Sequence, residues 1–365
     1  MKKIGVGIIG CGGITLQNHL PGLALCKDVS VTAICDTDTA TLDRAKASIK
    51  DAFSTNDYRE VMTRKDVDAV IIATPNFVHA PIALAAIQAG KHVLCEKPIA
   101  MNFGEAVMMY KMAEQAGVRH MTAFTYRFVP AMRYMRHLIK EGAVGTPWHF
   151  RSCRLQDWGT RSVGWRQVAK MAGSGEMGDM LSHRIDYSHM LMGPMTKIVA
   201  HTQRIHNVRD GQPNDLEDWV VIVADFTGGA VGVLESSKMA TGRGEGIKSQ
   251  DYVEVNGSEG SIIFQLEQPL FLQMAKKSES KAEPVPVPQE FLKVKGSPRD
   301  PNVGDPALTF RYDQNFEFIE AIRDKRPCSP SFYDGALTQG VIDAALTSAK
   351  ERRWIDVSNL QKQLA

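Results

Sequence analysis

The sequence predicts two domains: an α/β domain with a doubly wound parallel sheet, followed by an α+β domain with a large open, mainly antiparallel sheet. Three observations predict this. Short β-branched runs alternate with helix-compatible stretches over residues 1–124, and a glycine-rich turn follows the first run. After residue 127, strand-like runs follow one another with only short turns between them. A length of 365 residues also fits two domains, at about 150 residues per domain. We place the domains at 1–124 and 125–365.

The elements of the first domain alternate in type along the chain. Helices between strands imply crossover connections, and so a parallel sheet with both faces covered. Gly90 and Gly117 follow two of the helices, where a left-handed cap is expected. The expected strands are 4–9, 31–35, 69–73, 92–95 and 118–123, and the expected helices are 14–26, 40–50, 78–89 and 104–116.

The second domain begins with a helix and then runs mostly as strands. Consecutive strands without crossover helices predict antiparallel pairing. Residues 276–289 are expected to form a loop or an edge segment, residues 298–306 a loop, and the last helix is a candidate for packing back on the first domain. The expected helices are 128–140, 174–192, 312–323 and 333–352, and the expected strands are 148–155, 197–203, 218–226, 230–236, 250–257 and 261–266.

Composition excludes several classes of protein. The formal net charge is +2, and no basic run is long enough to predict a nucleic-acid partner. No uncharged apolar stretch reaches the roughly 18 residues of a membrane span, and the short, glycine-rich start is interpreted as a strand rather than a signal peptide. The six cysteines are scattered without a CxxC pair, which predicts reduced, mostly buried thiols in the cytoplasm.

The first expected strand runs into Gly10-Cys11-Gly12-Gly13-Ile14-Thr15. In a dinucleotide-binding turn, glycines allow a tight turn and a close pyrophosphate, and the next helix directs its N-terminus at the anion. We therefore predict a Rossmann cofactor site at Gly10, Gly12, Gly13 and Ile14, although the spacing also fits a plain turn. Thr15 takes the third glycine position, which predicts slightly wider strand–helix packing.

Asp36 ends the second expected strand. An acid at this position can accept hydrogen bonds from the adenosine ribose of NAD. The nearest arginine in the sequence that could hold a 2′-phosphate is Arg44, so NAD is predicted over NADP. Asp38 is expected to cap the next helix.

Polar residues also follow the third and fourth of these strands. The crevice beyond the carboxyl ends of parallel strands is the usual ligand site. Thr74 and Asn76 are therefore candidate cofactor contacts, with helix capping as the alternative for Asn76. His79 is a candidate in the first turn of the next helix, where a supporting role is favoured over a catalytic one.

Glu96, Lys97 and Pro98 follow the fourth strand, so an acid and a lysine are expected to face the same crevice. Pro98 restricts Lys97 away from helical angles and permits a cis peptide bond. The alternative is a solvated Glu96 and Lys97 with surface ion pairs only.

Asp179 and His183 are four residues apart in the expected helix 174–192, so they share a face. A carboxylate near an imidazole favours the imidazolium and can orient the ring. His183 is a candidate general base, because an ordinary histidine pKa of about 6.5 suits proton transfer near neutral pH. A surface pair on the helix is the alternative.

These segments resemble the glucose–fructose oxidoreductase / inositol dehydrogenase / rhizopine catabolism (Gfo/Idh/MocA) family. The resemblance covers nearly the whole chain. It implies a Rossmann domain, NAD(P)-dependent oxidation of sugars, inositols and related polyols, and oligomers (a homodimer or a homotetramer) formed through the second-domain sheet. The matching segments are Gly10–Gly13, Asp36, Asp66–Pro75, Ala89–Pro98, Tyr126-Arg127-Phe128 and Gly178–Asp186.

The resemblance further implies that Lys97 and His183 flank the nicotinamide, with Asp179 beside them. We expect His183 to accept the hydroxyl proton while a hydride passes to the cofactor, and Lys97 to stabilise the charge that develops on oxygen. Which of the two is the primary base stays open. Asp179 would bind substrate hydroxyls or fix His183.

Five further residues are weaker candidates. Arg127 would contact cofactor or substrate, or form a structural ion pair. Trp165 and Arg166 resemble a segment that approaches the nicotinamide in relatives, although Trp165 also fits a core position. Trp158 and Arg161 would stack on and hydrogen-bond a sugar, with ordinary surface packing as the alternative.

The leading function is an NAD-dependent dehydrogenase that oxidises a hydroxyl of a sugar, inositol or glycoside to a ketone. The alternative keeps NAD tightly bound and oxidises the sugar transiently, for epimerisation or elimination. A non-enzymatic NAD-binding regulator is disfavoured by the co-occurrence of Lys97, Asp179 and His183. No HxxxH or CxxC spacing supports a metal site, and neither nucleic acid nor membrane is an expected partner.

Overall fold

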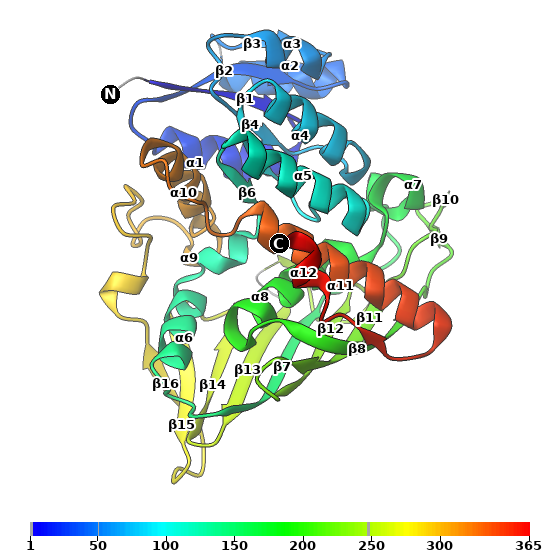
Figure 1. Cartoon of the computed structure of the whole chain (residues 1–365), viewed down its shortest axis with the longest axis vertical. Coiled ribbons are helices and arrows are strands. Elements are labelled where there is room, and N and C mark those ends of the chain that lie inside the picture. The colour runs from blue at the N-terminus through cyan, green and yellow to red at the C-terminus, as the bar shows by residue number, and fades with distance from the viewer. Residues whose placement is uncertain (1–2, 50, 247–248) are drawn as a thin grey trace.

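The computed structural model describes residues 3–49, 51–246 and 249–365 of the chain. A six-stranded sheet, sheet A, is formed by the start of the chain, and a nine-stranded sheet, sheet B, by the later part. Helices from the end of the chain lie between the two sheets (Figure 1). Among the described residues, no helix combines the length and the apolar character needed to cross a membrane.

Sheet A has the strand order β3-β2-β1-β4-β5-β6, and all of its pairs are parallel. Its order reverses between β1 and β4, which opens a crevice beyond their carboxyl ends. The strands are β1 (Ile4–Ile9), β2 (Val29–Cys35), β3 (Phe53–Thr55), β4 (Ala69–Ile72), β5 (His92–Cys95) and β6 (His120–Thr122). All six residues of β1 are buried, as expected for a strand covered by helices on both faces.

The helices of this part of the chain are α1 (Leu20–Ala24), α2 (Thr39–Ser48), α3 (Tyr58–Thr63), α4 (His79–Gln88) and α5 (Phe103–Ala116). Gly90 and Gly117 have the expected left-handed backbone, with φ of 70° and 67°. Lys50, the predicted end of the second helix, lies outside the described residues. The elements β3 and α3 were not predicted, because such short segments show no clear hydrophobic period.

The predicted helix 14–26 is not a single α-helix. A π-helical segment, Thr15–His19, leads directly into α1, whose first turn contains Pro21. Proline has no N–H to continue the hydrogen-bond ladder of a preceding helix, but it fits the first turn of a new one.

Sheet B has the order β16-β15-β14-β13-β7-β12-β11-β8-β17, and its pairs are antiparallel apart from β7 with β12. The predicted fold class is confirmed. The predicted loop or edge segment 276–289 contains the edge strand β16, where two prolines interrupt the donors that an inner strand would need. The strands are β7 (Pro147–Leu155), β8 (Met195–Gln203), β11 (Trp219–Phe226), β12 (Val231–Ser237), β13 (Gln250–Gly257), β14 (Gly260–Gln265), β15 (Phe271–Lys276), β16 (Glu283–Pro286) and β17 (Ile355–Asp356), beside a separate pair, β9 (Val208–Arg209) and β10 (Gln212–Pro213).

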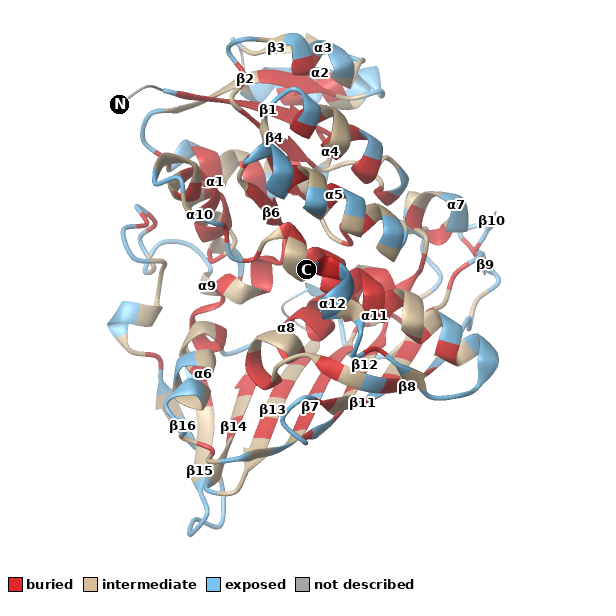
Figure 2. Cartoon of the chain, in the orientation of Figure 1, coloured by how far each residue is buried: buried red, intermediate tan, exposed pale blue. Residues whose placement is uncertain are grey.

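One face of sheet B is covered by helices. Buried and less buried bands alternate along its strands (Figure 2), and on β11 the residues Val220 and Ile222 are buried while Val223 is exposed. The buried face forms one apolar core with the helices α6, α8 and α11 of the later chain. The helices of the later chain are α6 (Pro130–Lys140), α7 (Ala169–Ala172), α8 (Ser182–Met192), α9 (Pro306–Thr309), α10 (Tyr312–Arg323), α11 (Phe332–Glu351) and α12 (Leu360–Leu364), with a π-helical segment, Met177–Leu181, directly before α8.

Buried ion pairs fix α8 on the sheet. Arg184 of α8 and Arg154 of β7 both reach the same carboxylate oxygen of Asp251 on β13, with 3.2 Å between Arg154 Nη1 and Asp251 Oδ2. All three side chains are almost fully buried. Removing one partner from such a cluster would leave a buried charge uncompensated, so the cluster strongly restrains where α8 lies.

The end of the chain returns to the first domain. Phe318 and Ile319 of α10 join the apolar core on one side of sheet A, and Phe332 and Ala336 of α11 join the core on the other. The helix α11 also packs on β8 of sheet B. The two sheets are therefore held together by shared helices as well as by the connection after β6.

Candidate active site

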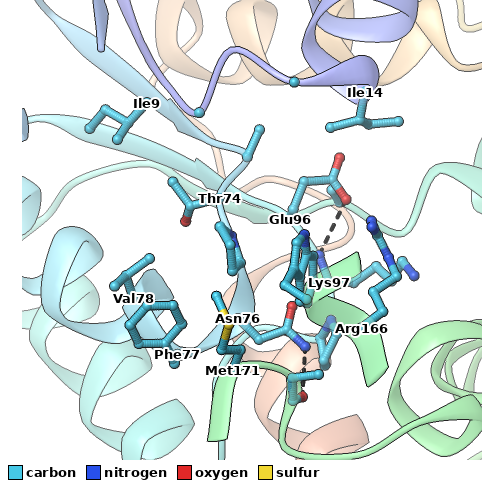
Figure 3. A pocket seen from close by; sticks show the side chains of 18 of the residues that line it. Ile9, Ile14, Thr74, Asn76, Phe77, Val78, Glu96, Lys97, Arg166 and Met171 are labelled. Carbon is cyan, nitrogen blue, oxygen red and sulfur yellow. Dashed lines mark hydrogen bonds between the residues drawn. The ribbon is translucent and has the colours of Figure 1, made fainter. Parts of the chain in front are cut away.

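A cavity of about 740 Å³ lies beyond the carboxyl ends of β1, β2, β4 and β5. It is lined from the first domain by the glycine turn and by residues that directly follow these strands, and from the second domain by Trp165, Arg166, Asp179 and His183. Figure 3 shows Glu96, Lys97 and Arg166 across this space from Phe77 and Val78. Residues distant in the sequence thus meet at the position that the strand order favours for a ligand.

The glycine turn borders this cavity. Gly10 has a φ of 93°, and a Cβ there would lie 2.4 Å from the Ala73 carbonyl oxygen, so only glycine fits. At Gly12 and Gly13 a Cβ would meet nothing within 4 Å, which leaves open space where a pyrophosphate would approach the backbone. The hydroxyl of Thr15 donates to the Gly10 carbonyl oxygen at 2.6 Å, an interaction that the usual glycine could not make.

Asp36 is held at the rim by two backbone N–H groups. Cys11 donates to Oδ2 at 2.8 Å and Asp38 donates to Oδ1 at 2.9 Å. A carboxylate oxygen can accept more than one hydrogen bond, so both oxygens can still accept from ribose hydroxyls. Asp38 caps α2 as predicted, because its side chain accepts from the Thr41 N–H.

Thr74 and Asn76 line the cavity and carry unpaired polar atoms. Thr74 Oγ1 and Asn76 Oδ1 are buried and have no hydrogen-bond partner among the described residues. Buried polar atoms without a partner are uncommon unless a ligand or a water molecule forms hydrogen bonds with them. A bound dinucleotide would supply such hydrogen bonds here. The capping alternative for Asn76 is wrong, because its Nδ2 donates instead to the Ala172 carbonyl oxygen of the second domain at 2.8 Å.

His79 does not line the cavity. It is fully buried, with its ring nitrogens 2.9 Å from the Pro98 carbonyl oxygen and 3.0 Å from that of Thr74. Burial lowers the pKa of this histidine. The residue therefore ties together two segments that carry cavity residues, which is the supporting role favoured from the sequence rather than direct contact with a cofactor.

Lys97 forms an ion pair across the domain boundary. Its Nζ lies 3.1 Å from Asp179 Oδ1 and also donates to the Asp179 carbonyl oxygen. Burial alone would raise the Asp179 pKa, but the charges of Lys97, Arg166 and Lys238 outweigh it and hold this pKa far below its usual value. The peptide bond from Lys97 to Pro98 is cis.

Glu96 also lines the cavity, where His19 lies 3.0 Å from its Oε1. Burial alone would raise the Glu96 pKa, but the hydrogen bond and charge of His19 and the charge of Lys97 outweigh it, so the pKa is lowered. The alternative of a solvated Glu96 and Lys97 is wrong, because both side chains are largely buried and each is paired.

His183 is not oriented by Asp179. The Asp179 carboxylate turns to Lys97, and His183 Nδ1 is buried without a hydrogen-bond partner among the described residues. The Tyr126 ring packs edge-on against the imidazole, with 4.7 Å between ring centroids. Burial, and then the positive charges of Lys97 and Arg184, lower the His183 pKa well below its usual value. The ring is therefore neutral at neutral pH, as a general base must be.

The weaker candidates divide into two groups. Trp165 and Arg166 line the cavity, with Arg166 stacked on the Trp165 ring and its Nε 3.8 Å from Asp179 Oδ1. Trp158 and Arg161 do not line it; they stack on each other, and Arg161 pairs with Glu245 at the surface.

Arg127 also lies outside the cavity lining. Its guanidinium makes two hydrogen bonds to Asp186 and one to Asp334, with 2.8 Å from Nε to Asp186 Oδ2 and from Nη2 to Asp334 Oδ1. Arg127 thus forms a structural ion pair, which was the second of the two roles expected from the sequence. The pair joins the start of the second domain to α8 and α11.

Among the cavity residues that were not singled out as site candidates from the sequence, two lie near His183. Tyr126 and Arg311 both line the cavity. Tyr126 belongs to a matched family segment and could have been inferred from it. Arg311 directly precedes α10 at the end of an irregular segment, and no motif marks it. Within residues 3–49, 51–246 and 249–365, no group of three or more His, Cys, Asp or Glu side chains could hold a metal ion.

The chain is similar to known proteins over nearly its whole length. Residues 4–124 match the model of an oxidoreductase family with an NAD-binding Rossmann fold, and residues 132–263 match the GFO/IDH/MocA C-terminal domain. Levoglucosan dehydrogenase of Pseudarthrobacter phenanthrenivorans is 34% identical, over 99% of this chain and 100% of its own.

A more distant relative is myo-inositol 2-dehydrogenase of Thermotoga maritima, which is 27% identical over 71% of this chain and 74% of its own. A solved structure of levoglucosan dehydrogenase in complex with NADH and levoglucosan has a TM-score of 0.89 and 31% identity. It covers 98% of this chain and 100% of that chain.

We predict that Asp36→Ala weakens NADH binding by about tenfold or more, because charge-assisted hydrogen bonds to the ribose are lost. Binding of NADPH should weaken less, since its 2′-phosphate is repelled by Asp36 in the parent. Fluorescence titration with both nucleotides measures this, with Asp43→Ala as an exposed control on α2. An equal loss for the two nucleotides would contradict the assigned role.

Proposed function

The chain belongs to the Gfo/Idh/MocA family and is an NAD-dependent oxidoreductase; we propose that it oxidises a hydroxyl of a sugar, an inositol or a glycoside to a ketone. The observation that carries the proposal is the meeting of Lys97, Asp179 and His183 in one cavity with the glycine turn and Asp36. The relatives that match most of this chain, levoglucosan dehydrogenase and myo-inositol 2-dehydrogenase, support a polyhydroxylated substrate.

The residues of the cavity divide the binding of NAD between them. Gly12 and Gly13 would leave room for the pyrophosphate, and Asp36 would accept hydrogen bonds from the adenosine ribose. Thr74 and Asn76 would form hydrogen bonds with the cofactor nearer the catalytic residues. When bound, NAD supplies the acceptor for the hydride that leaves the substrate carbon.

The proton is handled by the chain itself. His183 is neutral at neutral pH, so it accepts the proton of the substrate hydroxyl. The Lys97 ammonium donates a hydrogen bond to the same oxygen and stabilises the negative charge that develops there. Asp179 holds Lys97 in place through their ion pair, and its Oδ2, which has no partner among the described residues, accepts from a further substrate hydroxyl.

The buried surroundings strengthen these interactions. Lys97 and Asp179 expose only 15% and 12% of their side chains. Hydrogen bonds to a developing charge are stronger where water is excluded, and the groups need no reorganisation during the reaction. The site is therefore arranged before the substrate binds.

We extend the proposal to assembly and location. The open face of sheet B carries exposed apolar residues, including Val223 and Val231, and a homodimer or homotetramer through this face would cover them. All six cysteines are free and buried, which suits a reducing cytoplasm.

The function is tested by incubating the purified chain with NAD and a panel of inositols, aldoses, uronates and glycosides. We expect absorbance at the NADH wavelength to rise with at least one of them. Turnover of a sugar without NADH release would instead indicate retained NAD and transient oxidation. Binding of NAD without turnover of any sugar would contradict the proposal.

Lys97→Ala should lower kcat by about 10²–10³-fold, because the oxygen of the transition state loses its cationic hydrogen-bond donor. Affinity for NADH should change little. Steady-state kinetics and fluorescence titration measure the two effects, with the exposed Lys281→Ala as the matched control. Unchanged turnover in the Lys97 variant would refute the mechanism.

The pH dependence follows from the lowered pKa of His183. A base must be unprotonated, so kcat/KM should stay level as the pH falls toward 6.5 and decline only below it, as the imidazole becomes protonated. His183→Asn should lower kcat and remove this acid limb. A midpoint at or above 6.5 would show that the ring is not held neutral as described.

A further inference from the structure

Arg311 is a cavity residue for which the mechanism above has no use. It directly precedes α10 and lines the cavity from the second domain. Its guanidinium carbon lies 5.9 Å from the centroid of the Tyr126 ring, and that ring in turn packs against His183. The charge of Arg311 also contributes to the lowered pKa of His183. Arg311 therefore lies near the reacting end of the cavity.

The guanidinium of Arg311 is not paired with a carboxylate. No Asp or Glu oxygen of the described residues lies within 4 Å of it, and its Nε is buried without a hydrogen-bond partner. Its ring neighbours, Tyr126 and Phe310, provide aromatic faces and no anion. The arginines described above at positions 127, 154 and 184 each reach a carboxylate.

The charges at this end of the cavity do not balance. Lys97, Arg166 and Arg311 are cationic, and His183 is neutral. Asp179 is the carboxylate that pairs with both Lys97 and Arg166. Glu96 is engaged by His19, and Asp36 lies at the end of β2, beside the glycine turn. Of the three cations, Arg311 is therefore the one without a carboxylate partner among the described residues.

The phosphates of NAD do not account for this excess. The open space for a pyrophosphate lies at Gly12 and Gly13, on the glycine turn after β1. Arg311 instead contacts the Tyr126 ring that packs on the proposed base. A neutral sugar bound here would cover a guanidinium without pairing it, which is unfavourable. A carboxylate matches the planar donor fork of arginine.

We propose that the substrate is an acidic sugar or polyol, and that Arg311 binds its carboxylate while Lys97 and His183 act on a hydroxyl of the same molecule. This inference rests on the proposed function. It makes Arg311 a specificity-determining residue, which selects an acid over the corresponding neutral sugar.

Paired substrates that differ at one carbon test the inference. D-galacturonate is compared with D-galactose, D-glucuronate with D-glucose, and D-mannuronate with D-mannose, each in NADH-forming assays with the purified chain. For at least one pair we expect kcat/KM to be about tenfold or more higher for the acid. The KM of the acid should rise with added KCl more than that of the neutral sugar, because salt screens the charge pair.

Variants of Arg311 test whether this residue causes the preference for the acid. Arg311→Gln should lower kcat/KM for the acid by about 100-fold, mainly through KM, and change the value for the neutral sugar far less. Arg311→Lys should retain part of the preference, because it keeps the charge and loses the fork. Arg353→Gln is the matched control, since Arg353 is exposed and pairs with Glu351 outside the cavity.

Binding of the same acids and neutral sugars to the NADH-loaded chain is measured by the change in NADH fluorescence. This measurement requires no turnover. Tighter binding of the neutral member in every pair, or an equal loss for both members in Arg311→Gln, would overturn the inference. NADH formation with neutral sugars only would overturn it as well and leave the proposed function standing. If no sugar is oxidised, the proposed function fails, and the binding preference still decides the role of Arg311.

Discussion

The ion pair between Lys97 and Asp179 is the interaction on which the proposed chemistry depends. It joins the end of β5 to the π-helical segment before α8, so it forms only when the two domains are in place. The same contact lowers the pKa of Asp179, and the charge of Lys97 helps to keep His183 neutral. One contact thus sets the position of the cation and contributes to the protonation of the proposed base.

Buried ion pairs of the second domain fix the elements that carry this contact. Arg184, Arg154 and Asp251 anchor α8 to sheet B, and Arg127 ties the start of the domain to α8 and α11. Replacing such buried charges with apolar residues is often neutral or stabilising, so the benefit of the clusters lies in fixed geometry rather than in stability. A site that must place its groups within a fraction of an ångström benefits from rigid support of this kind.

Residues at strand ends could be predicted from the sequence, and contacts between domains could not. Asp36 and Lys97 follow strands that are visible from hydrophobic patterning, so their position in the crevice follows from topology. Capping was one role considered for Asn76, and fixing His183 was one role considered for Asp179. Local spacing contains no information on Ala172 or Lys97, which are their partners in the structure. Arg311 lies beside an irregular segment without a motif, and only the folded chain brings it to Tyr126.

The return of the last helices to sheet A has a consequence for biosynthesis. Phe318 and Ile319 complete the apolar core on one side of the sheet, and Phe332 completes it on the other. Domains generally fold as units, starting from the N-terminal one during translation. Here the N-terminal sheet must wait for residues that are synthesised long after its own strands. Until then part of the apolar surface of this sheet is uncovered, so we expect the incomplete chain to be prone to aggregation.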